Sequence, residues 1–215
     1  MTFSAASRPL RRLRAALGRF AASRLSGVAR DDRGVSAIEF ALILPILITL
    51  FIGGNELGQA VSMYRKASHS GSVIGDLITQ TSSVATGGDM DNMFNAALAI
   101  MLPFPQSGLK IVVAQVTMDA SGSPKVTWRD SKNGGDEAAW SCGSPPPSRI
   151  DIPAAMKVAN TSLIITEVEY QWKSNFSAIT KDLFGTDTIK LKDVAMLRPR
   201  MSETIPYADN SRNCS

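Results

Sequence analysis

Hydrophobic residues are concentrated first in one long run near the N-terminus of this chain. Residues 40–54 contain no charged side chain, and residues 35–38 extend the run on the other side of Glu39. The whole stretch reaches the roughly 20 residues that an α-helix needs to cross a bilayer. We therefore predict a transmembrane helix over residues 35–56.

Beyond this run, apolar positions recur at helical spacing. They predict a further helical section over residues 57–84, with a weak point at the Ser- and Gly-rich stretch 68–75. A separate amphipathic helix is predicted over residues 89–102, where apolar residues follow at three- and four-residue intervals before Pro103. We interpret its methionines as core residues.

The second half of the chain changes to the two-residue period of β-strands. Residues 109–118 form a β-rich run, and a turn separates them from the alternating residues 125–129. The clearest alternation lies in residues 164–173, and a last strand is predicted to reach residue 197. We therefore predict an α+β protein, in which a single long N-terminal transmembrane helix precedes a head with a roughly four-stranded antiparallel sheet within residues 109–197.

A long loop and a polar tail complete the expected architecture. Residues 130–160 contain clusters of Gly and Pro, and a loop of this length often marks a functional or interaction surface. Residues 198–215 form the polar tail. Cys142 and Cys214 lack a metal-type spacing, so in an exported domain we expect them to form one disulfide; two unpaired thiols are the alternative.

Charge divides the chain at residue 34. Residues 1–34 carry eight Arg and two Asp, a net 8 − 2 = +6, whereas residues 35–215 carry 15 basic and 17 acidic side chains, a net 15 − 17 = −2. The high pI therefore belongs to the N-terminus and does not indicate a nucleic-acid surface. Because positive charge beside a first hydrophobic segment keeps that side in the cytoplasm, we expect a basic cytoplasmic leader over 1–34 and an exported domain over 57–215.

The leader has apolar residues at helical spacing among its arginines. This pattern predicts a short basic amphipathic helix that lies on anionic membrane lipids. An Arg-rich segment without an acid before Asp31 is also typical of a mitochondrial transit peptide, which is the alternative. The membrane run and the border that follows favour the cytoplasmic leader.

Gly34 and Glu39 mark the border between leader and helix. A carboxylate inside a membrane segment must be neutralised or paired, so Glu39 is a functional candidate; an interfacial residue that reaches the headgroups is the alternative. The residues after the run make a poor signal-peptidase site. Cleavage is better placed at Gly34, whose missing side chain suits a protease cleft, although an ordinary helix-start glycine would look the same.

The sequence GVSAIEF at residues 34–40 resembles a type IV prepilin processing site, in which Gly precedes a mature chain with Glu as its fifth residue and then an apolar helix. The continuation, ALILP at 41–45 and ELG at 56–58, resembles more specifically the TadE-like pilus assembly family. This group comprises TadE-, TadF- and TadG-type minor pseudopilins of tight-adherence (Flp pilus) systems, and the sequence does not separate the three types.

The resemblance implies that a prepilin peptidase cuts between Gly34 and Val35 at the bacterial inner membrane, with the head in the periplasm. Other pilins, pseudopilins and the Tad secretion machinery would be the partners. The carboxylate of Glu39, beside Phe40, would pair with the Val35 amine of a neighbouring subunit and set the helix register. Pro45 is expected to kink the helix, because it removes one backbone hydrogen bond.

Glu56 and Gly58 lie near the outer end of the membrane run. Small residues there would let a partner helix approach closely. For Glu56 we favour the simpler interpretation, that the helix leaves the membrane at this point and the side chain enters solvent.

Catalytic chemistry is not indicated by this sequence. Glu167 and Glu169 are two residues apart on a predicted strand, which solvation of its polar face explains better than acid–base catalysis. His69 stands between serines without a supporting acid. We expect no enzyme activity, no cofactor, no metal and no nucleic-acid partner. The alternative functions are an uncleaved, single-pass, membrane-anchored periplasmic binding or scaffold protein and, less favoured, an exported hydrolase.

Overall fold

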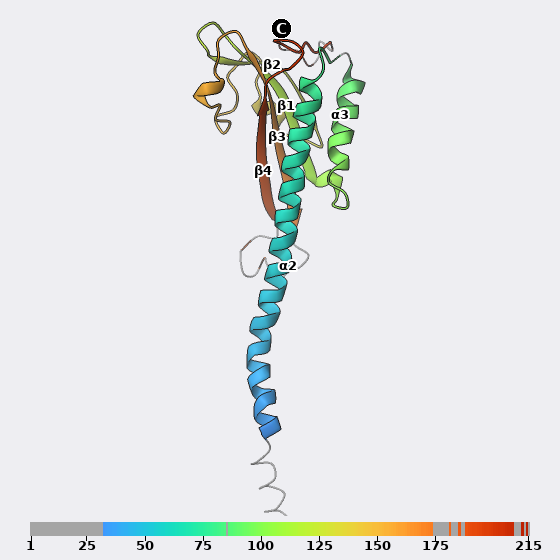
Figure 1. Ribbon diagram of the computed structural model, residues 1–215, viewed down its shortest axis with the longest axis vertical. Coiled ribbons are helices and arrows are strands. Elements are labelled where there is room, and N and C mark those ends of the chain that lie inside the picture. Colours follow the sequence, from blue (N-terminus) through green and yellow to red (C-terminus); the bar gives the residue numbers. More distant parts are fainter. Residues whose placement is uncertain are drawn as a thin grey trace, which may run out of the picture. The chain divides into compact units, whose positions relative to one another are not determined.

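The computed structural model describes residues 32–84, 86–173, 181, 185, 188–208, 212 and 214. The amphipathic helix expected in the leader lies outside these residues. The chain divides into two compact units, Met1–Gly54 and Asn55–Ser215. Each unit is described separately below (Figure 1).

Helix α2 spans Asp32–Thr79 and contributes to both units. Within the described part of the chain, it is the one helix long and apolar enough to cross a membrane. The helix expected to reach residue 84 ends at Thr79. There, the hydroxyls of Thr79 and Thr81 donate to the backbone carbonyls of Asp76 and Ile78, at 2.8 Å each. Such side-chain bonds compete with the helical backbone pattern and favour its end.

Helix α3 spans Gly87–Ala99 and begins two residues before the expected start. Thr86 and Asp89 form a capping box: the Thr86 hydroxyl accepts from the Asp89 backbone N–H at 3.2 Å, and the Asp89 carboxylate accepts from the Thr86 N–H at 3.0 Å. At the other end, Lys66 Nζ donates to the carbonyls of Ile100 and Leu102 at 3.2 and 2.5 Å. Lys66 of α2 thus holds the C-terminal end of α3 in place within the second unit.

Four antiparallel strands form one sheet in the order β2-β1-β3-β4. Their bounds are Leu109–Met118 for β1, Pro124–Lys132 for β2, Ser162–Lys173 for β3 and Thr188–Leu197 for β4. Short 3₁₀ turns lie at Gln106–Gly108, Glu137–Ala139 and Ala154–Met156. The predicted α+β class, with its long apolar helix and four-stranded antiparallel sheet, is confirmed.

One face of the sheet packs against α3 and the second-unit part of α2 (Figure 1). Close approach depends on two glycines of α2. A Cβ added at Gly71 would lie 3.0 Å from Val168, and one added at Gly75 would lie 2.7 Å from Leu197. The Ser- and Gly-rich stretch, expected to be a weak point, is therefore helical and lies close to Val168 and Leu197 of the sheet. The buried apolar residues of this core include Met63, Ile74, Ile78, Phe94, Met101, Ile111, Trp128, Ile164, Val168 and Tyr170.

The opposite face of the sheet carries a second core. The long loop expected over residues 130–160 begins after β2, at residue 133. The segment 133–160 contributes Trp140, Ile150 and Ile152, which pack on strand residues such as Val112 and Ile165. A Cβ added at Gly135 would collide with the carbonyl oxygen of Ile111, so this segment lies directly against the sheet. Covering this face with apolar side chains explains why β1 and β3 are apolar on both sides.

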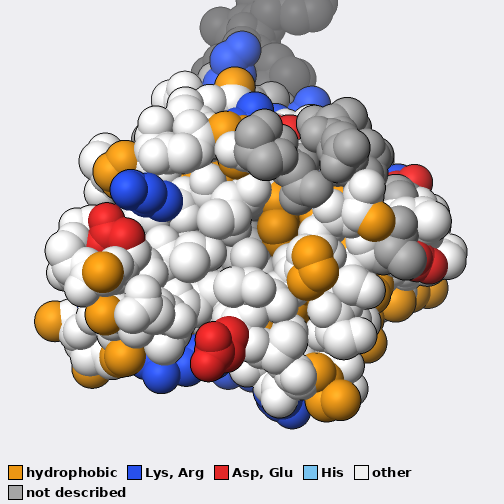
Figure 2. All heavy atoms as spheres, turned by 90° about the horizontal axis from the view of Figure 1, so that it is seen from above, with side chains coloured by type: hydrophobic (Ala, Val, Ile, Leu, Met, Phe, Trp, Pro, Cys, Tyr) orange, Lys and Arg blue, Asp and Glu red, His pale blue; other side chains and the backbone are white. Residues whose placement is uncertain are grey.

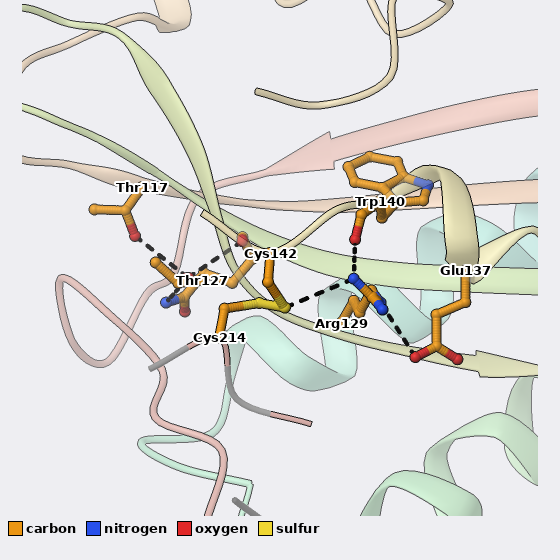
Figure 3. The surroundings of a disulfide bond; sticks show 8 residues. Thr117, Thr127, Arg129, Glu137, Trp140, Cys142 and Cys214 are labelled. Carbon is orange, nitrogen blue, oxygen red and sulfur yellow. Dashed lines mark hydrogen bonds and ion pairs between the residues drawn. A yellow bond between two sulfur atoms is a disulfide. The ribbon is translucent and has the colours of Figure 1, made fainter. Parts of the chain in front are cut away.

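The polar tail is fastened along the outer edge of β2. Cys142 and Cys214 form the expected disulfide, with a Cα–Cα distance of 4.9 Å. The backbone N–H of Cys214 donates to the carbonyl of Thr127 at 2.9 Å. Figure 3 shows that the Arg129 side chain extends from β2 beside this disulfide, toward the carbonyl of Trp140 and the carboxylate of Glu137.

Buried tail residues join the same edge to the first core. The indole N–H of Trp128 donates to the carbonyl of Ile205 at 2.7 Å, and the Tyr207 hydroxyl donates to Asp130 at 2.7 Å. The Trp128 and Tyr207 rings meet edge to face, with centroids 5.4 Å apart. The tail therefore closes one side of the core. On the face in Figure 2, basic, acidic and apolar side chains are interspersed.

Candidate assembly site on the N-terminal helix

Gly34 and Val35 lie in the first turn of α2, which begins at Asp32. The first four backbone N–H groups of a helix have no intrahelical partner, so this turn opens more easily than the helix interior. Among the described residues, no atom lies within 4 Å of a Cβ added at Gly34, and the Val35 side chain is 56% exposed. The described part of the chain therefore leaves the expected processing site uncovered.

Glu39 and Phe40 lie in the next turn, and both side chains are exposed. Apolar residues surround the helix here on every side, and large ones such as Ile38, Leu42 and Leu50 are more than 60% exposed. Within the described part of the chain, the Glu39 carboxylate has no ion-pair partner. An apolar surface of this kind needs either lipid or other helices to cover it.

Pro45 lies inside α2, and the helix continues on both sides of it. The hydroxyl of Thr49 donates to the Pro45 carbonyl at 2.8 Å, a bond from residue i to residue i−4. This bond gives that carbonyl a donor in addition to the backbone one, and hydroxyls in this arrangement often accompany bends in helices.

Glu56 is where the structure departs from the expectation of a side chain in solvent. The residue is only 6% exposed, while Leu57 beside it is 66% exposed. Glu56 shares one side of α2 with Ala60, Met63 and Ala67, which follow at intervals of four, three and four residues and pack in the first core. A Cβ added at Gly58 would meet no atom within 4 Å among the residues that the structure describes.

The second unit contains a polar cluster that the sequence pattern did not reveal. Arg149 and Glu167 form an ion pair, and Glu167 is 7% exposed. The interpretation of Glu167 as part of a solvated strand face is therefore wrong, because the 133–160 segment covers that face. Arg149 lies in an irregular segment, so no periodic pattern of the sequence could predict its position beside β3.

Charge pairing around this cluster shifts two pKa values. Glu167 accepts hydrogen bonds from Arg149 and so raises the pKa of that guanidinium further above its ordinary value. On the neighbouring strand, Lys192 donates to Glu169 at 2.8 Å and lowers the pKa of that carboxyl. These shifts come from mutual pairing, which also suits a purely structural role.

Other residues considered for chemistry do not converge on a site. His69 is exposed on α2. In the described residues, His, Cys, Asp and Glu side chains do not gather in any group of three that could hold a metal ion. The candidate site is therefore the apolar part of α2, whose large hydrophobic side chains are exposed and which is flanked by two acids, Glu39 and Glu56.

Comparison with known proteins bears on this same helix. The TadE-like protein family matches residues 34–70, which include Gly34, Glu39, Pro45 and Glu56. No curated protein and no solved structure matches the chain. The match confirms the resemblance seen in the sequence: residues 34–70 of this chain are similar to the TadE-like protein family.

Proposed function

We propose that this protein is a minor pseudopilin-like component of a Tad/Flp-type pilus, processed after Gly34 and incorporated through its apolar N-terminal helix. The observation that carries the proposal is the exposed apolar surface of α2 over residues 35–54, in which the one charged residue is an acid at the fifth position after Gly34. The TadE-like match over the same residues supports a role in Tad pilus assembly.

In this proposal, a prepilin peptidase of the bacterial inner membrane cleaves the Gly34–Val35 bond from the cytoplasmic side. The new α-amine of Val35 is positively charged at neutral pH. Glu39 of an adjacent subunit pairs with this amine in a medium of low dielectric constant, where a lone carboxylate would be costly. The pair selects one axial register of neighbouring helices, and other pilins, Tad machinery and lipids cover the apolar surface.

The N-terminus of the purified protein tests the processing step. Mass spectrometry of protein from the native host should show a chain that begins at Val35, and Gly34→Val should leave the leader attached. A wild-type chain that still begins at Met1 or Thr2 would instead support the alternative, an uncleaved single-pass periplasmic binding or scaffold protein.

The role of Glu39 is tested separately from processing. Glu39→Gln keeps the size of the side chain but removes its charge, so the variant should be cleaved normally and yet enter the sheared pilus fraction at least about tenfold less. Glu203→Gln, at an exposed acid of the second unit, is the matched control. Equal incorporation of the two variants would rule out a register role for Glu39.

A further inference from the structure

The two outer edges of the sheet, β2 and β4, differ in how their backbone groups are satisfied. On the outer side of β2, the N–H of Val126 donates to the carbonyl of Ser144 at 3.0 Å, and the N–H of Cys214 donates to the carbonyl of Thr127 at 2.9 Å. The 133–160 segment and the tail therefore close this edge of the sheet.

Strand β4 forms the other edge, which is open within the described part of the chain. Every second residue of an edge strand directs its N–H and C=O groups away from the neighbouring strand. Apart from the ladder with β3, residues 189–197 make no backbone hydrogen bond to any described residue. A row of unpaired groups is a template on which another extended segment can add as a strand.

One face of β4 is basic. The strand register places Lys110, Glu169 and Lys192 side by side across β1, β3 and β4, and Lys190 lies on the same face as Lys192. Lys192 donates to Glu169 at 2.8 Å, and this bond, together with the charge of Lys190, lowers the pKa of that carboxyl. Among the described residues, neither Lys110 nor Lys190 has an ion-pair partner. This face therefore carries cations without counter-charges.

The lysines of β4 are also the outermost charges of this face. Here β4 itself carries Lys190 and Lys192 and no acid, whereas Glu167 and Glu169 lie one strand further in. Glu167 is already paired with Arg149. A strand added to β4 would meet the two lysines first, so acidic side chains on it are favoured. A second copy of β4 would instead bring more lysines to the same face, which disfavours self-pairing.

The other face of β4 is apolar beside these lysines. Ile189 lies opposite Trp172 of β3, on the side of the first core, and is 47% exposed. No other large hydrophobic side chain of the described strands is as exposed. Leu191 follows on the same face and is partly buried against that core, and Asp193 ends the apolar stretch. An added strand therefore meets basic and apolar side chains in alternation.

We propose that β4 is the docking edge for an extended segment of another protein, in which acidic and apolar residues alternate. The segment adds as a fifth strand beside residues 189–197. Its backbone pairs with the open groups of β4, its acids face Lys190 and Lys192, and its apolar side chains cover Ile189 and Leu191. The contact needs no processing of the leader, so it goes beyond the proposed function and is tested independently of it.

A peptide of alternating Glu and Val, ten residues long like β4, is the probe. Added to the purified full-length protein in detergent, it should bind saturably and slow hydrogen–deuterium exchange in residues 189–197, with exchange in β2 unchanged. A peptide with all its Glu before all its Val has the same composition and charge but cannot place its acids on one face of a strand. This control peptide should bind at least about tenfold more weakly.

A charge reversal on the edge tests the same contact from the side of the protein. Lys190→Glu should weaken binding of the alternating peptide at least about tenfold, because like charges then face each other. Arg65→Glu makes the same change of charge at an exposed cation of α2 and should leave binding unchanged. Both substitutions are at exposed side chains, so the fold should tolerate them.

Three results would overturn the inference: equal binding by the two variants, equal binding of the two peptides, or unchanged exchange in residues 189–197 when the peptide is bound. Protection of these residues that rises with protein concentration in the absence of peptide would overturn it as well, because a second copy of the chain would then occupy the edge.

Discussion

Arg149 and Glu167 form a two-pronged ion pair where the 133–160 segment crosses the sheet. Arg149 Nε donates to Oε1 of Glu167 at 2.7 Å, and Nη2 donates to Oε2 at 2.8 Å. Trp140 Nε1 donates to the same Oε2 at 3.2 Å. The pair attaches an irregular segment to β3 and satisfies an acid that apolar residues would otherwise bury alone.

Removing one partner of this pair should be costly. Arg149→Met leaves Glu167 buried beside one remaining donor, and we expect a loss of about 2 kcal/mol, less than for a fully buried pair because the Arg149 side chain is 34% exposed. Chemical unfolding of the purified protein measures this loss. The double variant Arg149→Met/Glu167→Met should recover much of it, since no buried charge remains; a double variant as unstable as the single one would contradict this account.

The Cys142–Cys214 disulfide should contribute more than any single side-chain contact of the tail. It joins residues 72 apart, and closing a loop of this size stabilises a domain by ~4 kcal/mol in the chain-entropy model. Cys142→Ser/Cys214→Ser should therefore lower the unfolding midpoint and expose the tail to proteolysis. Cleavage sites mapped by mass spectrometry should lie beyond residue 208. Unchanged midpoint and digestion pattern would show that the other tail contacts suffice.

The turn at Asp119 should produce a local dependence of stability on pH. Hydrogen bonds from Ser121 and Ser123 lower the pKa of Asp119 from 3.8 to about 2. A depressed folded-state pKa contributes stability above the unfolded-state value, and that stability is lost as pH falls from about 4 to about 2. Asp119→Asn keeps an acceptor oxygen but should flatten the fall of the unfolding midpoint in this range. A pH profile identical to wild type would contradict the assignment.

Two glycines of α2 make a matched pair for helix packing. Both Gly58→Ala and Gly75→Ala should gain up to about 1 kcal/mol of helix propensity. At Gly75 the new methyl group would lie 2.7 Å from Leu197 and 3.3 Å from Thr166, whereas at Gly58 it would lie more than 4 Å from every described residue that is not adjacent in the helix. We expect Gly75→Ala to be the less stable by about 1–3 kcal/mol in unfolding measurements. Equal stability would mean that Leu197 moves aside at little cost.

The alternation of apolar and polar residues was enough to predict the strands but not the burial of their polar side chains. Residues 164–173 alternate so clearly that the sequence predicts β3 within two residues of its start, and it also predicts a sheet of roughly four antiparallel strands. The strand order β2-β1-β3-β4 comes from the structure alone. Alternation could not show that Glu167 is buried. That depends on Trp140 and Arg149, which come from a loop with no period of its own.

Local composition was least informative for α2. Serines and glycines at residues 68–75 disfavour an isolated helix, yet α2 continues through them. Gly71 and Gly75 are needed there because their missing side chains let the helix approach Val168 and Leu197. Tertiary packing thus compensates for low helix propensity. The sequence of the helix alone does not show how close the sheet will lie to it.

Sequence by itself determined the apolar helix, the position of Glu39 after Gly34, the α+β class and the two cysteines that could pair. These features depend on residue type and spacing along one segment, which are local properties. Tertiary structure decided the burial of Glu167 and Glu56, the attachment of the tail and the close helix–sheet contact at Gly75. Burial depends on which distant segment covers a side chain, so an acid that pattern places in solvent can lie in the interior. Glu167 does so with Arg149 as its partner, and Glu56 does so without a hydrogen-bond partner among the described residues.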